Sequence, residues 1–136
     1  FIRIRLLEIF YQFSFFTASQ RETEDKGSGY QAALVRSMME YLRKNYDGSI
    51  CLATLAKHFG LSKGHTCRLF KAMTHMTPFE YLNYYRINQS AYLLHNSDAD
   101  ISQIAGMTGF NNISYYNRTF QRYMHMTPSQ FRKSLL

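Results

Sequence analysis

The 136-residue sequence has few of the residues that interrupt or cross-link a chain: two prolines, two cysteines and seven glycines. Both prolines, Pro78 and Pro128, stand where helices would begin, and strand-like alternation of apolar and polar residues is missing. The two cysteines, Cys51 and Cys67, show no pairing pattern and fit a reducing cytoplasm better than a secreted disulfide scaffold. These absences predict an all-α, cytoplasmic protein.

Long hydrophobic runs are also lacking. The apolar opening, residues 1–16, is too short to span a bilayer and is interrupted by Arg3, Arg5 and Glu8. Its local charge is close to zero, whereas a helix on a membrane surface needs a basic face, so we expect no membrane partner. No signal peptide is visible, and because the first residue is Phe1 rather than Met, we interpret the chain as a fragment of a longer protein.

Catalytic and metal-binding patterns are missing as well. The sequence has no glycine-rich phosphate loop, and its five histidines are scattered, so we expect no enzyme and no cofactor. His65 and Cys67 stand two residues apart on a predicted helix and do not share a face, which argues against a metal site. Cys67 beside Arg68 and Lys71 is either a reactive thiol or, as we favour, a small residue on a binding face.

What the sequence does have is positive charge confined to one segment. Lys and Arg number 16 against nine Asp and Glu, a formal net charge of +7. Residues 1–29 hold four of each sign, so residues 30–136, with 12 basic and five acidic residues, carry the whole excess. The usual partners of a basic domain are nucleic acid, an anionic membrane or an acidic protein. The partner surface therefore belongs to residues 30–136.

The first 29 residues are expected to form a helix and a linker. A narrow apolar seam at helical spacing runs along residues 1–16 and consists of Ile2, Leu6, Ile9, Phe13 and Phe16. Two interpretations stay open: this helix packs on an upstream sensory or dimerisation domain, or it pairs with a second subunit in a homodimer. Residues 17–29 are polar and contain two glycines, which predicts a linker.

After the linker every signal is helical. Apolar periodicity predicts helices over about 30–46, 50–59, 62–73, 78–95, 101–107 and 111–124, and a last helix after Thr127. Gly60 is expected to end the second of them. Capping signals precede four helices, namely Ser28 with Gln31, Thr77-Pro78 with Glu80, Asp100 with Gln103, and Thr127-Pro128 with Gln130.

An internal repeat is the most informative feature. Residues 55–78 resemble residues 104–128 at matched positions, which are Ala56 and Ala105, Gly60 and Gly109, Arg68 and Arg118, Phe70 and Phe120, and the two His-Met-Thr-Pro tetrapeptides. Each copy reads as a short helix, a tight turn through glycine and a longer helix, which is the helix-turn-helix layout. We place the two units at about 50–73 and 101–124.

The second helix of each unit separates into two faces by spacing. The stripes expected in the core are Thr66, Leu69, Phe70 and Met73, and Tyr116, Thr119, Phe120 and Tyr123. The opposite faces are small, polar or basic and hold Gly64, Cys67, Arg68 and Lys71, and Ser114, Asn117, Arg118 and Gln121. One such face alone would be an ordinary solvated surface. Two copies in the segment that carries the net charge favour contact with base edges and phosphates in a major groove.

The sequence resembles the DNA-binding domain of the AraC/XylS family of bacterial regulators over residues 49–133. The resemblance is strongest in GFNNISYYNRTFQRYMHMTPSQFRK (109–133), and Arg86, Ala91 and Leu93-Leu94 resemble the family's linker-helix pattern. It implies a seven-helix fold, recognition helices at about 62–73 and 112–123, double-stranded DNA and RNA polymerase as partners, and an upstream effector-binding domain. The implied DNA contacts are Lys63, Gly64, His65, Cys67 and Arg68, and Asn112, Ile113, Ser114, Tyr115, Asn117 and Arg118.

Two departures from the family pattern modify this expectation. Gly64 offers no side chain where larger groups often contact bases, so we expect weak readout by the first unit, and Thr66 replaces a bigger apolar residue, so we expect a looser core. The helix predicted at 78–95, about 27 Å long at 1.5 Å per residue, would let one monomer reach two adjacent major grooves. The alternatives are a spacing that falls short so that the DNA bends to meet both helices, insertion of one unit alone, or a helical protein-interaction module that does not bind DNA.

Overall fold

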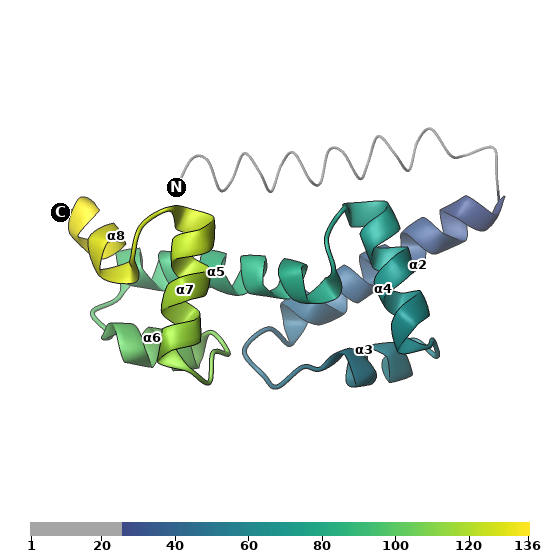
Figure 1. Ribbon diagram of the computed structural model, residues 1–136, viewed down its shortest axis with the longest axis horizontal. Coiled ribbons are helices and arrows are strands. Elements are labelled where there is room, and N and C mark those ends of the chain that lie inside the picture. The colour runs from purple at the N-terminus through teal and green to yellow at the C-terminus, as the bar shows by residue number, and fades with distance from the viewer. Residues whose placement is uncertain (1–25) are drawn as a thin grey trace. The chain divides into compact units, whose positions relative to one another are not determined.

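The computed structural model describes residues 26–136, which form seven helices and no strand (Figure 1). The all-α expectation is therefore confirmed for this part of the chain. The helix predicted at 1–16 lies outside the described residues. The helices are α2 (Lys26–Lys44), α3 (Leu52–His58), α4 (Lys63–Thr74), α5 (Pro78–Asn96), α6 (Ile101–Met107), α7 (Ile113–Met124) and α8 (Pro128–Ser134).

The start of α2 differs from the sequence prediction. The helix already includes Lys26, the first residue that the structure describes, so Ser28 lies inside it and the predicted Ser28–Gln31 capping box is wrong. The last four residues of the predicted linker, 26–29, are therefore helical. Each glycine in a helix costs only about 1 kcal/mol relative to alanine. Packing further along α2, where Val35 and Met38 are fully buried, outweighs that local cost.

The described residues divide into two compact units. The first unit comprises residues 26–42 and 51–79, with most of α2 and all of α3 and α4. The second unit comprises residues 43–50 and 80–136, with almost all of α5 and the whole of α6, α7 and α8. The helix predicted as a spacer is thus largely a part of the second unit, because its apolar residues pack into that unit's core.

Each unit buries its own set of apolar side chains. In the first unit the buried residues include Val35, Met38, Leu42, Leu55, Thr66, Leu69 and Phe70. In the second unit one cluster joins Ile87, Ala91, Leu94, Ile104, Ala105, Phe110, Tyr116, Phe120 and Phe131. Phe70 and Phe120 are both fully buried, which confirms that each repeat carries one central phenylalanine.

The two turns close in the same way, which explains the repeated Ala and Gly positions. In the first unit Leu61 N–H donates to the Ala56 carbonyl (2.9 Å) around Gly60, whose φ is +67°. In the second unit Phe110 N–H donates to the Ala105 carbonyl (2.9 Å) around Gly109, whose φ is +90°. This is the hydrogen-bond pattern of a glycine-terminated helix, and glycine adopts positive φ without strain.

A buried arginine binds the segment that connects α2 to α3, and this segment belongs to the second unit. Arg86 of α5 is 9% exposed and donates from Nε to the Tyr46 carbonyl (2.6 Å) and from Nη2 to the Gly48 carbonyl (2.8 Å). Burial lowers the pKa of the Arg86 guanidinium, which still stays charged at neutral pH. The family-like arginine of α5 therefore holds residues 43–50 in the second unit.

Candidate nucleic-acid interface

The helices α4 and α7 are matched in length, start and end. Each has 12 residues, and each begins after a polar N-cap, Ser62 or Asn112. Ser62 Oγ accepts from the His65 backbone N–H (3.1 Å), and Asn112 Oδ1 accepts from the Tyr115 backbone N–H (2.9 Å). Both caps satisfy a helix-end donor that would otherwise lack a partner. The two helices therefore correspond residue by residue at an offset of 50.

The inner faces of α4 and α7 agree with the stripes expected from spacing. Thr66 and Phe70 are fully buried in the first unit, as are Tyr116 and Phe120 in the second. Leu69 and Thr119 are nearly so, whereas Met73 and Tyr123 at the helix ends are half-buried. Thr66 is fully buried, and its hydroxyl donates to the Ser62 backbone carbonyl (2.8 Å). This smaller side chain therefore makes a hydrogen bond to the backbone one turn earlier.

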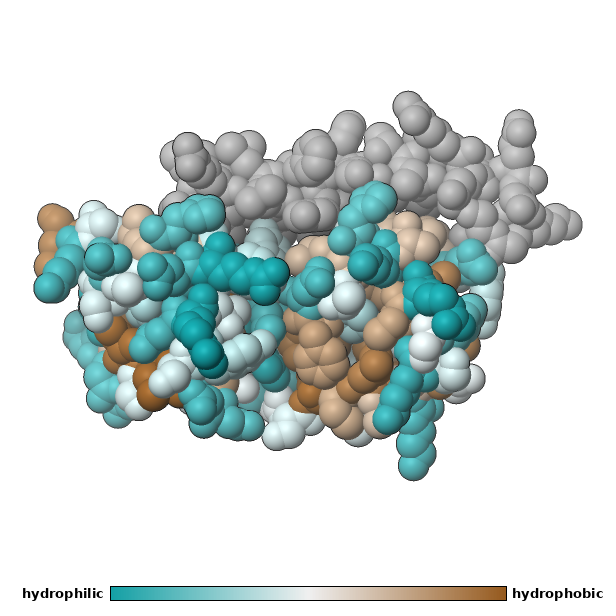
Figure 2. Space-filling model, in the orientation of Figure 1, coloured by the Kyte–Doolittle hydropathy of each residue, from teal (hydrophilic) through white to brown (hydrophobic). Residues whose placement is uncertain are grey.

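The outer faces carry the predicted DNA contacts. All but one of these residues are exposed, namely Lys63, Gly64, His65, Arg68 and Lys71 in the first unit and Asn112, Ile113, Ser114, Tyr115, Asn117, Arg118 and Gln121 in the second. Cys67 is half-buried. In the space-filling view hydrophilic residues gather over α7 (Figure 2). Exposure makes contact with DNA possible, and the assignment itself stays a prediction.

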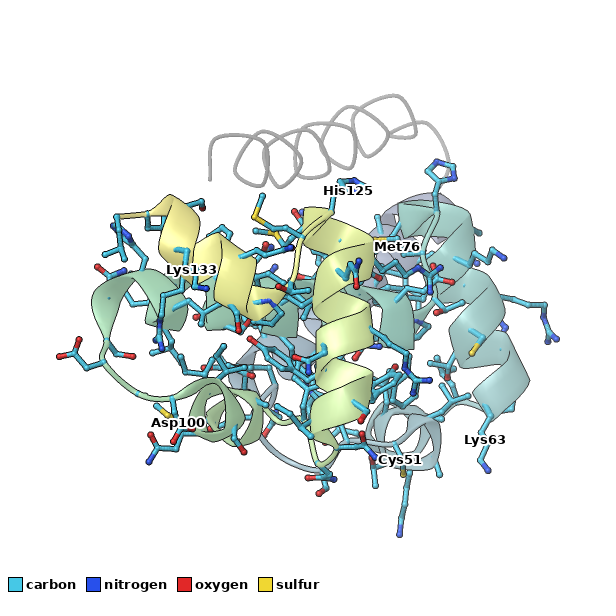
Figure 3. The ribbon with its side chains drawn as sticks, turned by 60° about the vertical axis from the view of Figure 1, so that its left-hand side comes forward. Cys51, Lys63, Met76, Asp100, His125 and Lys133 are labelled. Carbon is cyan, nitrogen blue, oxygen red and sulfur yellow. The ribbon has the colours of Figure 1, made fainter. Side chains whose placement is uncertain are left out.

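The two outer faces differ in chemistry. The exposed side chains of α4 include three cations, Lys63, Arg68 and Lys71, whereas α7 exposes two, Arg118 and Arg122, among amide and hydroxyl groups. Lys63 extends from the first turn of α4 (Figure 3). Lysine and arginine both bind phosphates, and amides, hydroxyls and arginine also bind base edges. The exposed face of α4 is thus the richer in cations, and that of α7 the richer in amide and hydroxyl groups.

Three of the predicted contacts have local roles that spacing does not reveal. The side-chain oxygen of Asn112, Oδ1, accepts the cap hydrogen bond from the Tyr115 backbone N–H. The Tyr115 hydroxyl accepts a hydrogen bond from Asn83 Nδ2 of α5 (2.8 Å). A Cβ added at Gly64 would lie 3.2 Å from the Arg68 guanidinium, so the missing side chain leaves room for Arg68 to lie back along α4.

Asn83 is the polar residue that sequence reasoning missed. It lies 32 positions before Tyr115 and on a different helix, so no local spacing connects the two. The helical period of α5 could have placed it on a face of that helix, but not beside α7.

Both cysteines are free thiols. A hydrogen bond with Thr54 is the main cause that lowers the pKa of Cys51, with a smaller effect from Lys63. Both cysteines belong to the first unit. Within residues 26–136 no three His, Cys, Asp or Glu side chains gather where they could hold a metal ion. None of the helices in that range combines the length and apolarity that crossing a bilayer requires.

Known proteins resemble this arrangement. Residues 55–134 match a family described as a helix-turn-helix domain. The HTH-type transcriptional regulator YdeC of Bacillus subtilis, itself uncharacterised, is 32% identical over 109 residues, which cover 80% of this chain and 38% of YdeC. The melibiose operon regulatory protein of Escherichia coli is 29% identical over 115 residues, which cover 85% of this chain and 38% of that protein. The chain therefore spans well under half the length of these curated relatives.

A solved structure shows the same fold. The DNA-binding domain of AdpA, a global transcriptional factor, in complex with a target DNA, matches with a TM-score of 0.70 at 23% identity and covers 74% of this chain and 90% of that chain. The double helix-turn-helix fold, the family match and the relatives agree with one another. The chain belongs to the AraC/XylS family of helix-turn-helix transcription regulators, whose members are DNA-binding proteins and not enzymes.

Proposed function

We propose that this chain binds double-stranded DNA sequence-specifically by inserting α4 and α7 into adjacent major grooves. The supporting observation is the pair of matched 12-residue helices that each bury one face and expose the other. A helix fits the major groove and reads base edges with its exposed side chains. The AdpA domain, which was solved with its target DNA, has the same fold.

Within this function we propose a division of labour between the units. The three cations on α4 hold the phosphate backbone, and Arg118, Asn117 and Gln121 on α7 read bases. Gly64 fits this assignment, because a position without a side chain cannot read a base. The salt dependence of binding should then come mainly from the first unit, since each phosphate neutralised releases counterions.

Substitution of one arginine in each unit tests both proposals. Arg118→Ala should weaken binding to a duplex selected by the protein from random sequence by about 1–3 kcal/mol and relax its specificity. Arg68→Ala should weaken binding to selected and scrambled duplexes alike. It should also reduce the slope of the logarithm of the binding constant against the logarithm of the salt concentration by about one unit. Lys133→Ala on α8 is the control, because it removes a charge that is exposed but belongs to neither recognition helix.

Fluorescence anisotropy against a salt titration, with thermal melting as the folding check, gives these values. Normal DNA binding by both folded variants would contradict the assignment of faces. Failure of the unsubstituted chain to bind any duplex would contradict the function itself and favour a protein-interaction module.

The remaining proposals concern the whole protein. We propose that it is cytoplasmic, responds to a small-molecule effector through a domain outside this chain, contacts RNA polymerase and dimerises with the help of residues 1–16. The fraction of the relatives' length that this chain covers, 38%, supports a further domain. Sedimentation with and without residues 1–16 tests the dimer, which the deletion should weaken while monomeric DNA binding is kept.

A further inference from the structure

Tyr115, in the first turn of α7, is held from three directions. Its backbone N–H donates to Asn112 Oδ1 (2.9 Å), its ring centroid lies 6.0 Å from that of the buried Phe110, and its hydroxyl accepts from Asn83 Nδ2 (2.8 Å). The side chain is nevertheless 45% exposed. An aromatic side chain that is both fixed and exposed at the start of a recognition helix is suited to contact a ligand at a defined position.

The contact with Asn83 determines what the Tyr115 hydroxyl can offer. A phenol oxygen has one hydrogen to donate and lone pairs with which to accept. Asn83 Nδ2 is a donor and occupies a lone pair, so the hydroxyl hydrogen remains available. Within residues 26–136 the hydroxyl makes no second hydrogen bond. The Tyr115 hydroxyl is therefore an oriented donor without an acceptor in the described part of the chain.

The matched position in the first unit has no such support. His65 occupies the third position of α4, as Tyr115 does in α7. Its backbone N–H is capped by Ser62 (3.1 Å), but its ring receives no hydrogen bond from the described residues. The support from α5 therefore distinguishes the second unit from the first.

We infer that Asn83 is a positioning residue for DNA binding, which orients the Tyr115 hydroxyl as a hydrogen-bond donor to an acceptor on the DNA. This inference rests on the proposed function and extends it to a residue of α5 outside both recognition helices. The acceptor is a phosphate oxygen or a base-edge oxygen or nitrogen. A hydrogen-bond donor that is already oriented before binding loses less conformational entropy when the DNA binds. Asn83 therefore raises the affinity for DNA without touching it.

A double-mutant cycle tests the inference on the 136-residue chain. Affinities are measured for the unsubstituted chain, Asn83→Ala, Tyr115→Phe and the double variant, on a duplex selected by the protein from random sequence and on a scrambled duplex of equal length. Tyr115→Phe should weaken binding about tenfold, the value of one hydrogen bond. Asn83→Ala should weaken it about threefold alone and by less than about twofold in the Tyr115→Phe background, because its effect passes through the hydroxyl.

Two further variants sharpen the cycle. Asn83→Asp has nearly the same size but can only accept, so it would capture the hydroxyl hydrogen and weaken binding at least as much as Tyr115→Phe. Asn83→Asp in the Tyr115→Phe background measures the effect of the added negative charge alone. That effect is subtracted from the loss that Asn83→Asp causes in the unsubstituted chain. Gln89→Ala, at another half-buried position of α5, controls for changes in that helix and should leave binding unchanged.

The outcomes separate this inference from the proposed function. An equal loss on both duplexes identifies a phosphate acceptor, and a larger loss on the selected duplex identifies a base. Normal affinity of a folded Asn83→Ala variant, or an Asn83→Ala effect that is undiminished without the Tyr115 hydroxyl, overturns the inference while DNA binding stands. Absence of binding by the unsubstituted chain to either duplex overturns both.

Discussion

Tyr116 carries a polar group that the core of the second unit does not use. Its side chain is fully buried, and within residues 26–136 its hydroxyl has no hydrogen-bond partner. Burial raises the pKa of Tyr116, and the nearby Ser90 hydroxyl, which donates to the Ile87 carbonyl (2.9 Å), lowers it in part but does not reach hydrogen-bond geometry with the Tyr116 hydroxyl. A buried hydroxyl without a partner costs about 1–3 kcal/mol, so the ring stabilises this core and the hydroxyl weakens it.

Tyr116→Phe should therefore stabilise the protein at pH 7 by about 1 kcal/mol, measured by urea denaturation. Tyr81→Phe is the matched control. Tyr81 is also buried, but its hydroxyl accepts from Arg43 Nη1 (3.0 Å), so its removal should cost about 1 kcal/mol. A clear loss of stability in Tyr116→Phe would mean that the hydroxyl has a partner in the folded protein.

The same substitution should change the response to alkaline pH. Burial raises the pKa of Tyr116 above its usual value of 10.0, so the unfolded chain ionises first. Stability from the neutral side chain is then present below about pH 10 and is lost as pH rises through the folded pKa. Denaturation curves should show a smaller alkaline loss for Tyr116→Phe than for the unsubstituted chain. Equal losses would exclude Tyr116 as a cause.

The two turn glycines serve different needs. Both have positive φ, but a Cβ at Gly60 would meet nothing within 4 Å, whereas one at Gly109 would lie 2.5 Å from the Tyr46 carbonyl oxygen and 2.8 Å from Arg86 Nε. Gly60→Ala should cost about 1–2 kcal/mol from the backbone alone. Gly109→Ala should cost about 2–5 kcal/mol, since crowding adds about 1–3 kcal/mol. Equal costs in urea denaturation would show that residues 43–50 do not pack on this turn.

At the scale of the element, α4 and α7 end at an unusual residue. His75 and His125 adopt left-handed conformations, with φ of +62° and +60°, and their N–H groups donate to the carbonyls of Lys71 and Gln121 (2.8 and 2.9 Å). His125 is at the C-terminal end of α7 (Figure 3). Glycine is the usual residue at such a position, because a side chain costs about 1 kcal/mol there.

Replacement of these histidines by glycine should stabilise each helix end. His75→Gly and His125→Gly should each add about 0.5–1 kcal/mol and raise the melting temperature by about 2–4 °C. Both side chains are exposed, so little packing is lost. A fall in melting temperature would show that the imidazoles make contacts worth more than the strain, and His→Ala at the same positions, which keeps the strain, separates the two effects.

Local signals predicted the helices well where the stabilising contacts are themselves local. Asp100 with Gln103 and Thr127 with Gln130 form the predicted reciprocal caps of α6 and α8. The equivalent signal at Ser28 failed, because a capping sequence does not prevent a helix from continuing through it. Contacts between segments far apart in sequence, such as Asn83 with Tyr115, left no periodic pattern from which to predict them.

At the scale of the whole molecule, the chain passes between its two units three times, after residues 42, 50 and 79. The second unit therefore depends on residues 43–50, whose carbonyls bind Arg86. Composition predicted the all-α class and the repeat predicted two units, but neither showed that a segment preceding the first repeat belongs to the second unit. An insertion in the middle of α5 would also disturb this core, so substitutions on α4 and α7 are the cleaner probes of two-site binding.

Hydroxyl-radical footprinting of the chain on a selected duplex tests the central claim most directly. Recognition helices in successive major grooves of one DNA face sit about 34 Å apart. We predict two protected patches about one helical turn apart without two-fold symmetry, with Arg68→Ala weakening one patch and Arg118→Ala the other. A single patch, or two patches that respond equally to both substitutions, would contradict the claim that each unit engages its own groove.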